Sequence, residues 1–266
     1  MNQRRTRRTA FPALALASVL TLAACSGDDE STSAAGATPV PGAGADDSAA
    51  AAERFAALPV TSIEATILDD MAGVSTIQAR VRATHLGLDV DAQVAVDDSA
   101  DCVGTVAIGE GTAEILRVGE QVYATFDQPF LEAMGHGPIE AGEITSSAAN
   151  RWVLLDLASG LTDVALACQA AVEAIGGEIF GGADADTQVT GLEQVGDRQV
   201  LGLERTSELG TTSLLVDATG EHRFVRIVAP RDGSPMTVDE LVYDEVVEVP
   251  DPDARGVVLS ADVGLS

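Results

Sequence analysis

The sequence predicts an α+β protein built on one curved antiparallel sheet of about ten strands, with helices packed on one face. A helical pattern, a series of short strands, a second helical pattern and a second series of strands follow one another along the chain. Strands do not alternate regularly with helices, which disfavours a parallel sheet. Glycine-containing turns separate the strands at short intervals, as in hairpins, and a sheet of this size curls.

The first helix is expected between Thr61 and Gly73. Thr61 and Glu64 fit a capping box, in which the two side chains satisfy free backbone N–H groups at the helix start. Ile67 and Met71 recur at the spacing that places apolar side chains on one helix face. Gly73 can end the helix because glycine adopts the backbone conformation of a C-cap.

The first series of strands begins with a segment in which small or apolar residues alternate with polar ones, typical of a half-buried strand. The expected strands are Gly87–Asp97, Val103–Ile108, Thr112–Val118, Gln121–Phe126 and Arg151–Leu157, with a short helix from Pro129 in the connection before the last. The second helix is expected over Leu161–Ile175, because its apolar residues repeat every three or four positions.

The second series contains five further strands, followed by an irregular tail from Pro250. These strands are predicted at Gln188–Val195, Arg198–Arg205, Thr211–Asp217, His222–Ala229 and Met236–Val249. No linker or change in composition interrupts residues 53–266, so we expect a single folded domain there.

The N-terminus has the pattern of an export signal. Arginines precede an apolar stretch that is too short to span a bilayer, and residues 1–24 are expected to be removed. The segment Leu22–Cys25 resembles a bacterial lipobox, which makes Cys25 the mature N-terminus and the site of lipid attachment, with acyl chains such as palmitate. An ordinary secretory signal with a chance cysteine is the alternative. The lipid would hold the protein on the extracytoplasmic face of the cell membrane, since two or more acyl chains anchor stably.

Residues 25–52 are expected to form a disordered tether after the lipidated cysteine. They are rich in Ala, Gly, Ser, Thr, Pro and Asp, and carry almost no large apolar side chain that could be buried. The folded part, residues 53–266, retains 11 arginines against 37 acidic residues, a net charge of −26. A surface of this charge would be repelled by anionic lipids, so membrane attachment would depend on the lipid.

The composition also excludes several functions. All 15 basic residues are arginine. Without lysine there is no Walker A phosphate site, no pyridoxal Schiff base and no kinase ATP site. The strongly acidic composition argues against nucleic-acid binding, which requires a basic surface. We expect no cofactor, no metal site and no enzymatic activity.

Cys102 and Cys168 remain after Cys25 is assigned to the lipid. An even pair of cysteines in an exported protein predicts a disulfide, here between a residue that precedes a strand and the apolar face of the second helix. Two buried free thiols are the alternative. A metal site is disfavoured because two sulfurs and three scattered histidines match no ligand spacing.

No residue pattern indicates catalysis. His85 ends a strand, His136 lies in a glycine-rich loop and His222 begins a strand, and none belongs to a known catalytic motif. A hydrolase would need these side chains in a common cleft. Pairs of aspartates such as Asp97 and Asp101 lack the calcium-loop pattern and are interpreted as solvated loop charges.

The aliphatic inner faces of the sheet and helices suggest an apolar cavity between them, because small side chains on a curved sheet leave space. A completely filled core is the alternative. The residues expected by face to line the cavity are Ile67, Met71, Val81, Val90, Val94, Val164 and Val172.

Taken together, these features resemble the LppX/LprG-type lipoproteins of actinobacteria, whose fold is similar to the LolA-type lipoprotein carriers. The resemblance rests on the lipobox, the tether, the helix-then-meander order and several strand-turn-strand stretches. These stretches are Gly104–Val106, Glu114–Tyr123, Arg151–Val153, Gly191–Val200, Leu214–Gly220 with His222–Ile227, and Tyr243–Pro250. The position of Asp101-Cys102 before a hairpin, with Cys168 on the second helix, is similar to cysteine-paired members of the wider group.

The resemblance implies a half-barrel sheet with helices on its concave face and a hydrophobic cavity between the two. It implies binding or transfer of a lipid or lipoprotein outside the cell membrane, without catalysis. We therefore expect a monomeric, membrane-anchored lipoprotein that binds an apolar ligand. A surface interaction protein with the same fold, a filled core and no ligand is the alternative.

Overall fold

The computed structural model describes residues 43–85, 87–156, 165–175, 186–208, 210–231 and 233–265, and the following description concerns these residues. Twelve of its strands form one sheet in the order β12-β6-β5-β4-β3-β2-β1-β11-β10-β9-β8-β7. Neighbouring strands are antiparallel, except that β12 and β6 are parallel. The predicted fold class, an α+β protein with a large, curved, unclosed sheet, is confirmed.

The first half of the sheet comes from the strands β1 (Ile77–His85), β2 (Leu88–Val96), β3 (Cys102–Ile108), β4 (Gly111–Val118), β5 (Gln121–Phe126) and β6 (Trp152–Leu154). The second half consists of β7 (Asp186–Val195), β8 (Arg198–Ser207), β9 (Gly210–Asp217), β10 (Phe224–Arg231) and β11 (Ser234–Tyr243), whereas β12 (Val257–Leu259) lies beside β6 at the edge of the first half. The helices are α1 (Ala43–Ala56), α2 (Val60–Ala72), α3 (Gln128–Ala133), α4 (Pro138–Ala148) and α5 (Leu166–Ile175).

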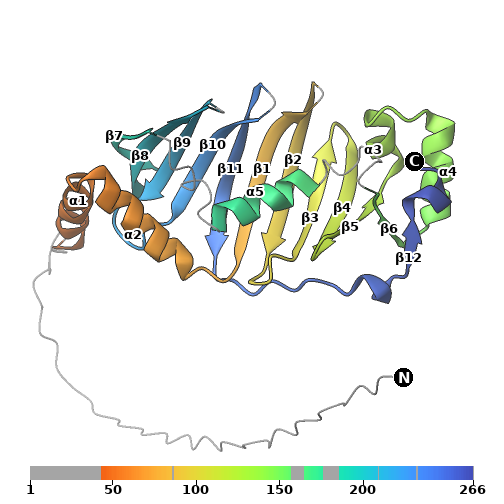
Figure 1. Cartoon of the computed structure of the whole chain (residues 1–266), viewed down its shortest axis with the longest axis horizontal. Coiled ribbons are helices and arrows are strands. Elements are labelled where there is room, and N and C mark those ends of the chain that lie inside the picture. Colours follow the sequence, from red (N-terminus) through yellow and green to blue (C-terminus); the bar gives the residue numbers. More distant parts are fainter. Residues whose placement is uncertain are drawn as a thin grey trace, which may run out of the picture. The chain divides into compact units, whose positions relative to one another are not determined.

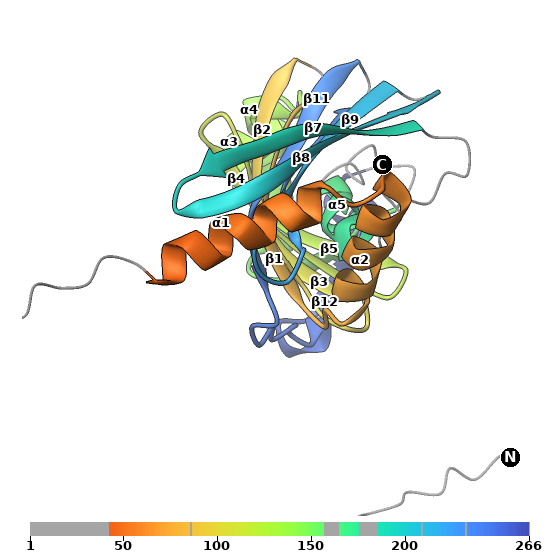
Figure 2. The same cartoon turned by 90° about the vertical axis from the view of Figure 1, so that its left-hand side faces the viewer.

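The helices cover one face of the sheet. Figure 1 shows α5 crossing the central strands, α1 and α2 near β7 and β8, and α3 and α4 near the opposite edge. In Figure 2 the sheet curls around α2 and α5. The alternation of side chains along β2 shows which face of the sheet forms the core. Ala92, Val94 and Val96 are buried on that face, and Gln93 is exposed on the other face.

The other face of the sheet carries a second, smaller hydrophobic cluster. Leu116, Tyr123 and Trp152 form it, and Val249 and Val257 pack against them. The two valines belong to the segment 244–265, which we call the C-terminal strap. The strap is tied to the sheet where the backbone N–H of Trp152 donates to the Gly256 carbonyl at 3.0 Å. The tail expected to be irregular from Pro250 therefore contributes a strand, β12, to the sheet edge.

Several local predictions are corrected. The segment 43–52, expected to belong to the tether, lies in α1, where Ala52 is fully buried beside Phe55. Alanine has the highest helix propensity, and the buried pair supplies the packing that a composition of small residues does not reveal. The helix α2 begins at Val60 after Pro59, which makes no side-chain capping bond, so the Thr61–Glu64 capping box is wrong.

Other differences concern elements that the sequence pattern marks weakly. The sequence predicted that His85 ends a strand but did not delimit β1, which runs from Ile77 between two strands of the sheet. The helix α4 was missed because its apolar face is short. The strand predicted over Met236–Val249 is β11, which ends at Tyr243 rather than Val249.

Candidate functional site

An apolar pocket lies where the sheet, α5 and the end of α3 meet. Its volume is about 60 Å³. Val81, Ala83, Val90, Ala92, Val106 and Ile108 line it from the sheet, Leu166 and Ala167 from α5, Met134 from the end of α3, and Pro235 and Met236 from β11. Thr84, Arg231 and Ser234 complete the lining. The lining favours an apolar ligand or part of one.

Small side chains on α5 explain why the pocket is narrow. Ala167, Ala170, Ala171 and Ala174 are all buried, and the helix packs on β1, β2 and β3. Alanine places the helix backbone close to the sheet, because interiors pack at nearly crystalline density and short side chains require a short interlayer distance. A sheet lined with small residues thus does not by itself leave a large cavity.

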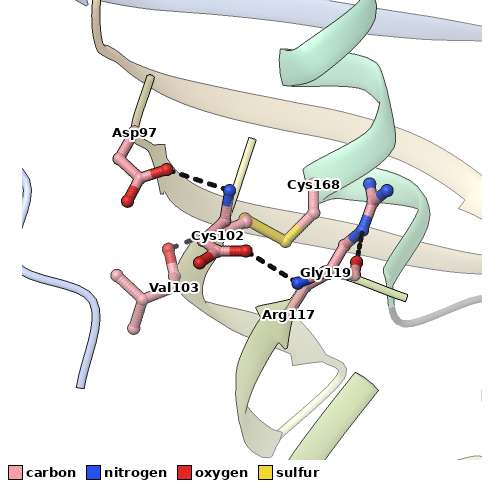
Figure 3. Close-up of a disulfide and its surroundings, with 7 residues drawn as sticks. Asp97, Cys102, Val103, Arg117, Gly119 and Cys168 are labelled. Carbon is pink, nitrogen blue, oxygen red and sulfur yellow. Dashed lines mark hydrogen bonds between the residues drawn. A yellow bond between two sulfur atoms is a disulfide. The ribbon is translucent and has the colours of Figure 1, made fainter. Parts of the chain in front are cut away.

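The Cys102–Cys168 disulfide attaches α5 to the sheet beside this pocket (Figure 3). The predicted pair is bonded, with Cα atoms 5.9 Å apart and both residues buried. The turn before Cys102 is held by hydrogen bonds, because Asp97 accepts from the Asp101 N–H at 3.0 Å and Asp101 accepts from the Gly119 N–H at 2.7 Å. Since Ala167 lines the pocket next to Cys168, the disulfide fixes one wall of it.

The residues that the sequence assigned to a cavity occupy different places. Val81 and Val90 border the pocket. Ile67 and Met71 are buried on the core-facing side of α2, and Val94 is buried in the core; none of the three borders the pocket. Val172 is half-buried on α5, Val164 and Cys25 lie outside the described residues, and the lipid attachment at Cys25 remains a prediction.

Two methionines at the pocket were not found from the sequence. Met134 is the C-cap residue of α3, and Met236 lies on β11 with 6% of its surface exposed. Met134 follows a short helix in a region interpreted mainly as a loop, so no periodicity marked it. Unbranched, polarizable methionine side chains adapt readily to ligands of varying shape.

The histidines do not form a common site in the described part of the chain. His222 Nδ1 lies 2.8 Å from Asp70 Oδ2, and the imidazole ring packs at a tilt against the Phe55 ring, with 3.9 Å between the ring centroids. His136 Nδ1 lies 3.2 Å from Glu140 Oε1, one helical turn away. The side chain of His85 is outside the described residues. Each described pair therefore joins neighbouring elements, and among the described residues no group of three or more His, Cys, Asp or Glu could hold a metal ion.

The acidic loop residues also serve local structure. Asp97 accepts hydrogen bonds from the backbone of Ser99 and Asp101, and Asp251 accepts from the backbone of Asp253. Such Asx-type turns use the carboxylate to order the loop. In the part of the chain that the structure describes, none of the helices combines the length and hydrophobicity needed to cross a membrane.

An open, curved, mostly antiparallel sheet with helices on its concave face defines the class of LolA- and LppX-like folds. Solved structures with this arrangement include the lipoprotein LppX of Mycobacterium tuberculosis, at 14% identity and a TM-score of 0.46, where the alignment covers 72% of this chain and all of LppX. LprF of Mycobacterium bovis has 14% identity and a TM-score of 0.45 over 72% of this chain and 95% of LprF.

A more distant match is an outer membrane lipoprotein-sorting protein domain of Vibrio parahaemolyticus. It shares 9% identity and a TM-score of 0.29, over 76% of this chain and 97% of that domain. At these identities the likeness is one of fold alone. No family model and no curated protein matches the sequence.

Proposed function

We propose that this chain is a lipoprotein anchored through Cys25 on the extracytoplasmic face of the cell membrane, whose domain (expected over residues 53–266) binds an apolar ligand such as an acylated lipid. The observation that supports the ligand is the apolar pocket between α5 and the sheet. Its walls contain mainly aliphatic and thioether side chains, and Thr84, Arg231 and Ser234 are its polar members. Such a lining binds water weakly and favours hydrocarbon.

The pocket volume sets how much of a ligand can enter. Sites for drug-sized ligands measure roughly 300–1,000 Å³, whereas this pocket measures about 60 Å³. It therefore accepts the end of an acyl chain with α5 in its present position, and a longer chain requires displacement of α5. That displacement is restrained by the Cys102–Cys168 disulfide, which bonds α5 to β3 next to the pocket-lining Ala167.

The small volume favours one alternative function, that of a surface interaction lipoprotein with a filled core. The two functions differ in whether an apolar molecule occupies the pocket. They share the membrane anchor and need no catalytic residue.

Substituting Ala83, which lines the pocket, by Phe is expected to reduce binding of a fluorescent fatty acid at least tenfold, because the ring occupies the space that the acyl chain enters. Ala107 on β3 faces the other side of the sheet with similar exposure, so Ala107→Phe is the matched control and should bind normally. Displacement titrations and native mass spectrometry of detergent-free protein measure the outcome. If no apolar molecule co-purifies with the unsubstituted protein and none binds to it when added, the result would support the filled-core alternative.

The anchor has a separate test. The Cys25→Ala variant is expected to move from the membrane fraction to the soluble extracytoplasmic fraction, since without the thioether no acyl chains are attached. Fractionation of cells followed by detection of the protein measures this. Retention of the variant in the membrane fraction would contradict anchoring through Cys25.

A further inference from the structure

The face of the sheet opposite α5 contains a second concavity, which we call the outer groove. It has a volume of about 590 Å³, within the range of roughly 300–1,000 Å³ that is typical of ligand sites. Outward-facing side chains of β11, β1, β2, β3 and β4 form its floor, and Pro250 and Arg255 of the C-terminal strap form one wall. It is separated from the apolar pocket by the sheet itself.

The strand register places four of its polar side chains in one row across the sheet. Arg80 of β1 is paired with Gln93 of β2, Gln93 with Thr105 of β3, and Thr105 with Glu114 of β4. On the other side, Arg80 is paired with Asp239 of β11, the neighbour of Glu240. The groove thus has a carboxylate at each end and an exposed amide and hydroxyl between them.

Hydrogen bonding within the row leaves acceptors available. Arg80 donates from Nε and Nη2 to Asp91 and from Nη1 to Glu240, so all three of its guanidinium nitrogens are engaged. The hydrogen bonds from Arg80 hold the pKa of Asp91 below its ordinary value. Arg255 donates to Glu114 and lies over the Trp152 ring, 5.1 Å from its centroid. The carboxylates remain accessible, since the side chains of Glu240 and Glu114 are 60% and 48% exposed.

These contacts favour a ligand that brings positive charge and hydrogen-bond donors. The arginines are neutralised by their partners, while each terminal glutamate uses a single oxygen for its arginine. The 37 acidic residues against 11 arginines in residues 53–266 add a long-range attraction for cations. Trp152 is 2% exposed and its ring is covered by Arg255, so it offers no platform on which a sugar could stack.

The length of the row sets the length of the ligand. Adjacent strands lie about 4.8 Å apart, so the four intervals from β11 to β4 span roughly 19 Å. An extended peptide advances about 3.3 Å per residue and covers this distance with about six residues. We propose that the outer groove binds an extended segment of a partner protein that carries two basic residues about six positions apart, an even spacing that places both side chains on the face toward the groove. Gln93 and Thr105 would bond its main chain.

Trp152, the only tryptophan in the chain, lies in the groove wall and provides a direct signal. The probe is a blocked nonapeptide of Ala, Ser and Thr with lysines at its second and eighth positions. We expect saturable binding to the full mature protein, seen as a change in Trp152 fluorescence and by calorimetry, that weakens as salt is raised. The same peptide with glutamates in place of the lysines should not bind.

Two kinds of variant locate the binding. The double variant Glu114→Gln, Glu240→Gln should weaken binding about tenfold, because exposed ion pairs contribute up to about 1 kcal/mol each. Glu53→Gln with Glu193→Gln, at exposed positions on α1 and β7, makes the same change in net charge and should bind as the unsubstituted protein does. Gln93→Phe should block the floor without altering charge.

Three results would overturn the proposal. The first is equal weakening in the two double variants, which would indicate general charge attraction. The second is binding of the glutamate peptide. Binding of a sugar, tested with a chito-oligosaccharide in place of the lysine peptide, would have the same meaning. The third is absence of binding at peptide concentrations up to about 1 mM, which corresponds to an interaction weaker than about 4 kcal/mol. Fatty-acid binding in the apolar pocket is unaffected by any of these results, so the two sites are tested independently.

Discussion

Replacing Cys102 and Cys168 together by alanine is expected to lower the free energy of unfolding by about 4 kcal/mol, the chain entropy released when a loop of this length is opened. The two residues are 66 positions apart in the sequence. Both are buried, so alanine avoids placing a hydroxyl group in the core. The remaining contacts of α5 with the sheet come largely from alanines, and they compensate little.

Urea denaturation of the unsubstituted protein and the double variant, with and without a thiol reductant, measures this effect. Reductant should destabilise the unsubstituted protein to a similar extent and leave the variant unchanged, which distinguishes loss of the cross-link from altered packing. Fatty-acid binding by the variant shows whether the disulfide also holds α5 over the pocket. A loss below about 1 kcal/mol would contradict the stabilising role of the bond.

The substitution Gly111→Ala is expected to destabilise the protein by about 2–3 kcal/mol through overpacking. A Cβ at Gly111 would lie 2.1 Å from the Phe130 nitrogen, 2.3 Å from the Phe130 Cα and 2.5 Å from the Pro129 carbonyl carbon. These atoms belong to the backbone of α3, which cannot rotate away as a side chain could. Asp127 also holds this helix start against β4, because it accepts from the Phe130 N–H and from the Thr112 N–H and hydroxyl.

A matched control exists at Gly137, the N-cap residue of α4. Its φ of −67° suits any residue, and an added Cβ meets no atom within 4 Å. Gly137→Ala should therefore leave the midpoint of urea denaturation nearly unchanged. Because Met134 follows α3 and lines the apolar pocket, Gly111→Ala should in addition alter fatty-acid affinity. Equal midpoints for the two variants would show that α3 is not packed tightly on Gly111.

Much of the sheet was predictable because strand alternation is local. The segment from Leu88 to Val96 shows which side chains face the core, and the structure buries Ala92, Val94 and Val96 accordingly. Elements without a strong period were missed. The alanine-rich start of α1 has the composition of a tether, and it is helical because Ala52 and Phe55 are buried. The strand β12 was missed because it has only three residues and lies in a proline- and aspartate-rich tail.

The candidate sites were less predictable. The positions expected by face to line a cavity included Val81 and Val90, which border the pocket, but the closing of the pocket by α5 and Met134 depends on how closely two layers approach. The outer groove could not be found from sequence, since Arg80, Glu114 and Glu240 become neighbours in one row only through the register of five strands. Register is a long-range property, set by the packing of whole strands.

Composition alone established that the protein is acidic and free of lysine. Local pattern predicted the export and lipidation signals, the antiparallel sheet and the pairing of Cys102 with Cys168. The structure confirms the sheet and the disulfide. These are properties of composition and of periods of a few residues, which act within one segment. The nearly full core under α5 and the hollow on the opposite face emerged with the three-dimensional arrangement alone. Both depend on the distance between layers and on the alignment of strands, where atoms far apart in the chain compete for the same space.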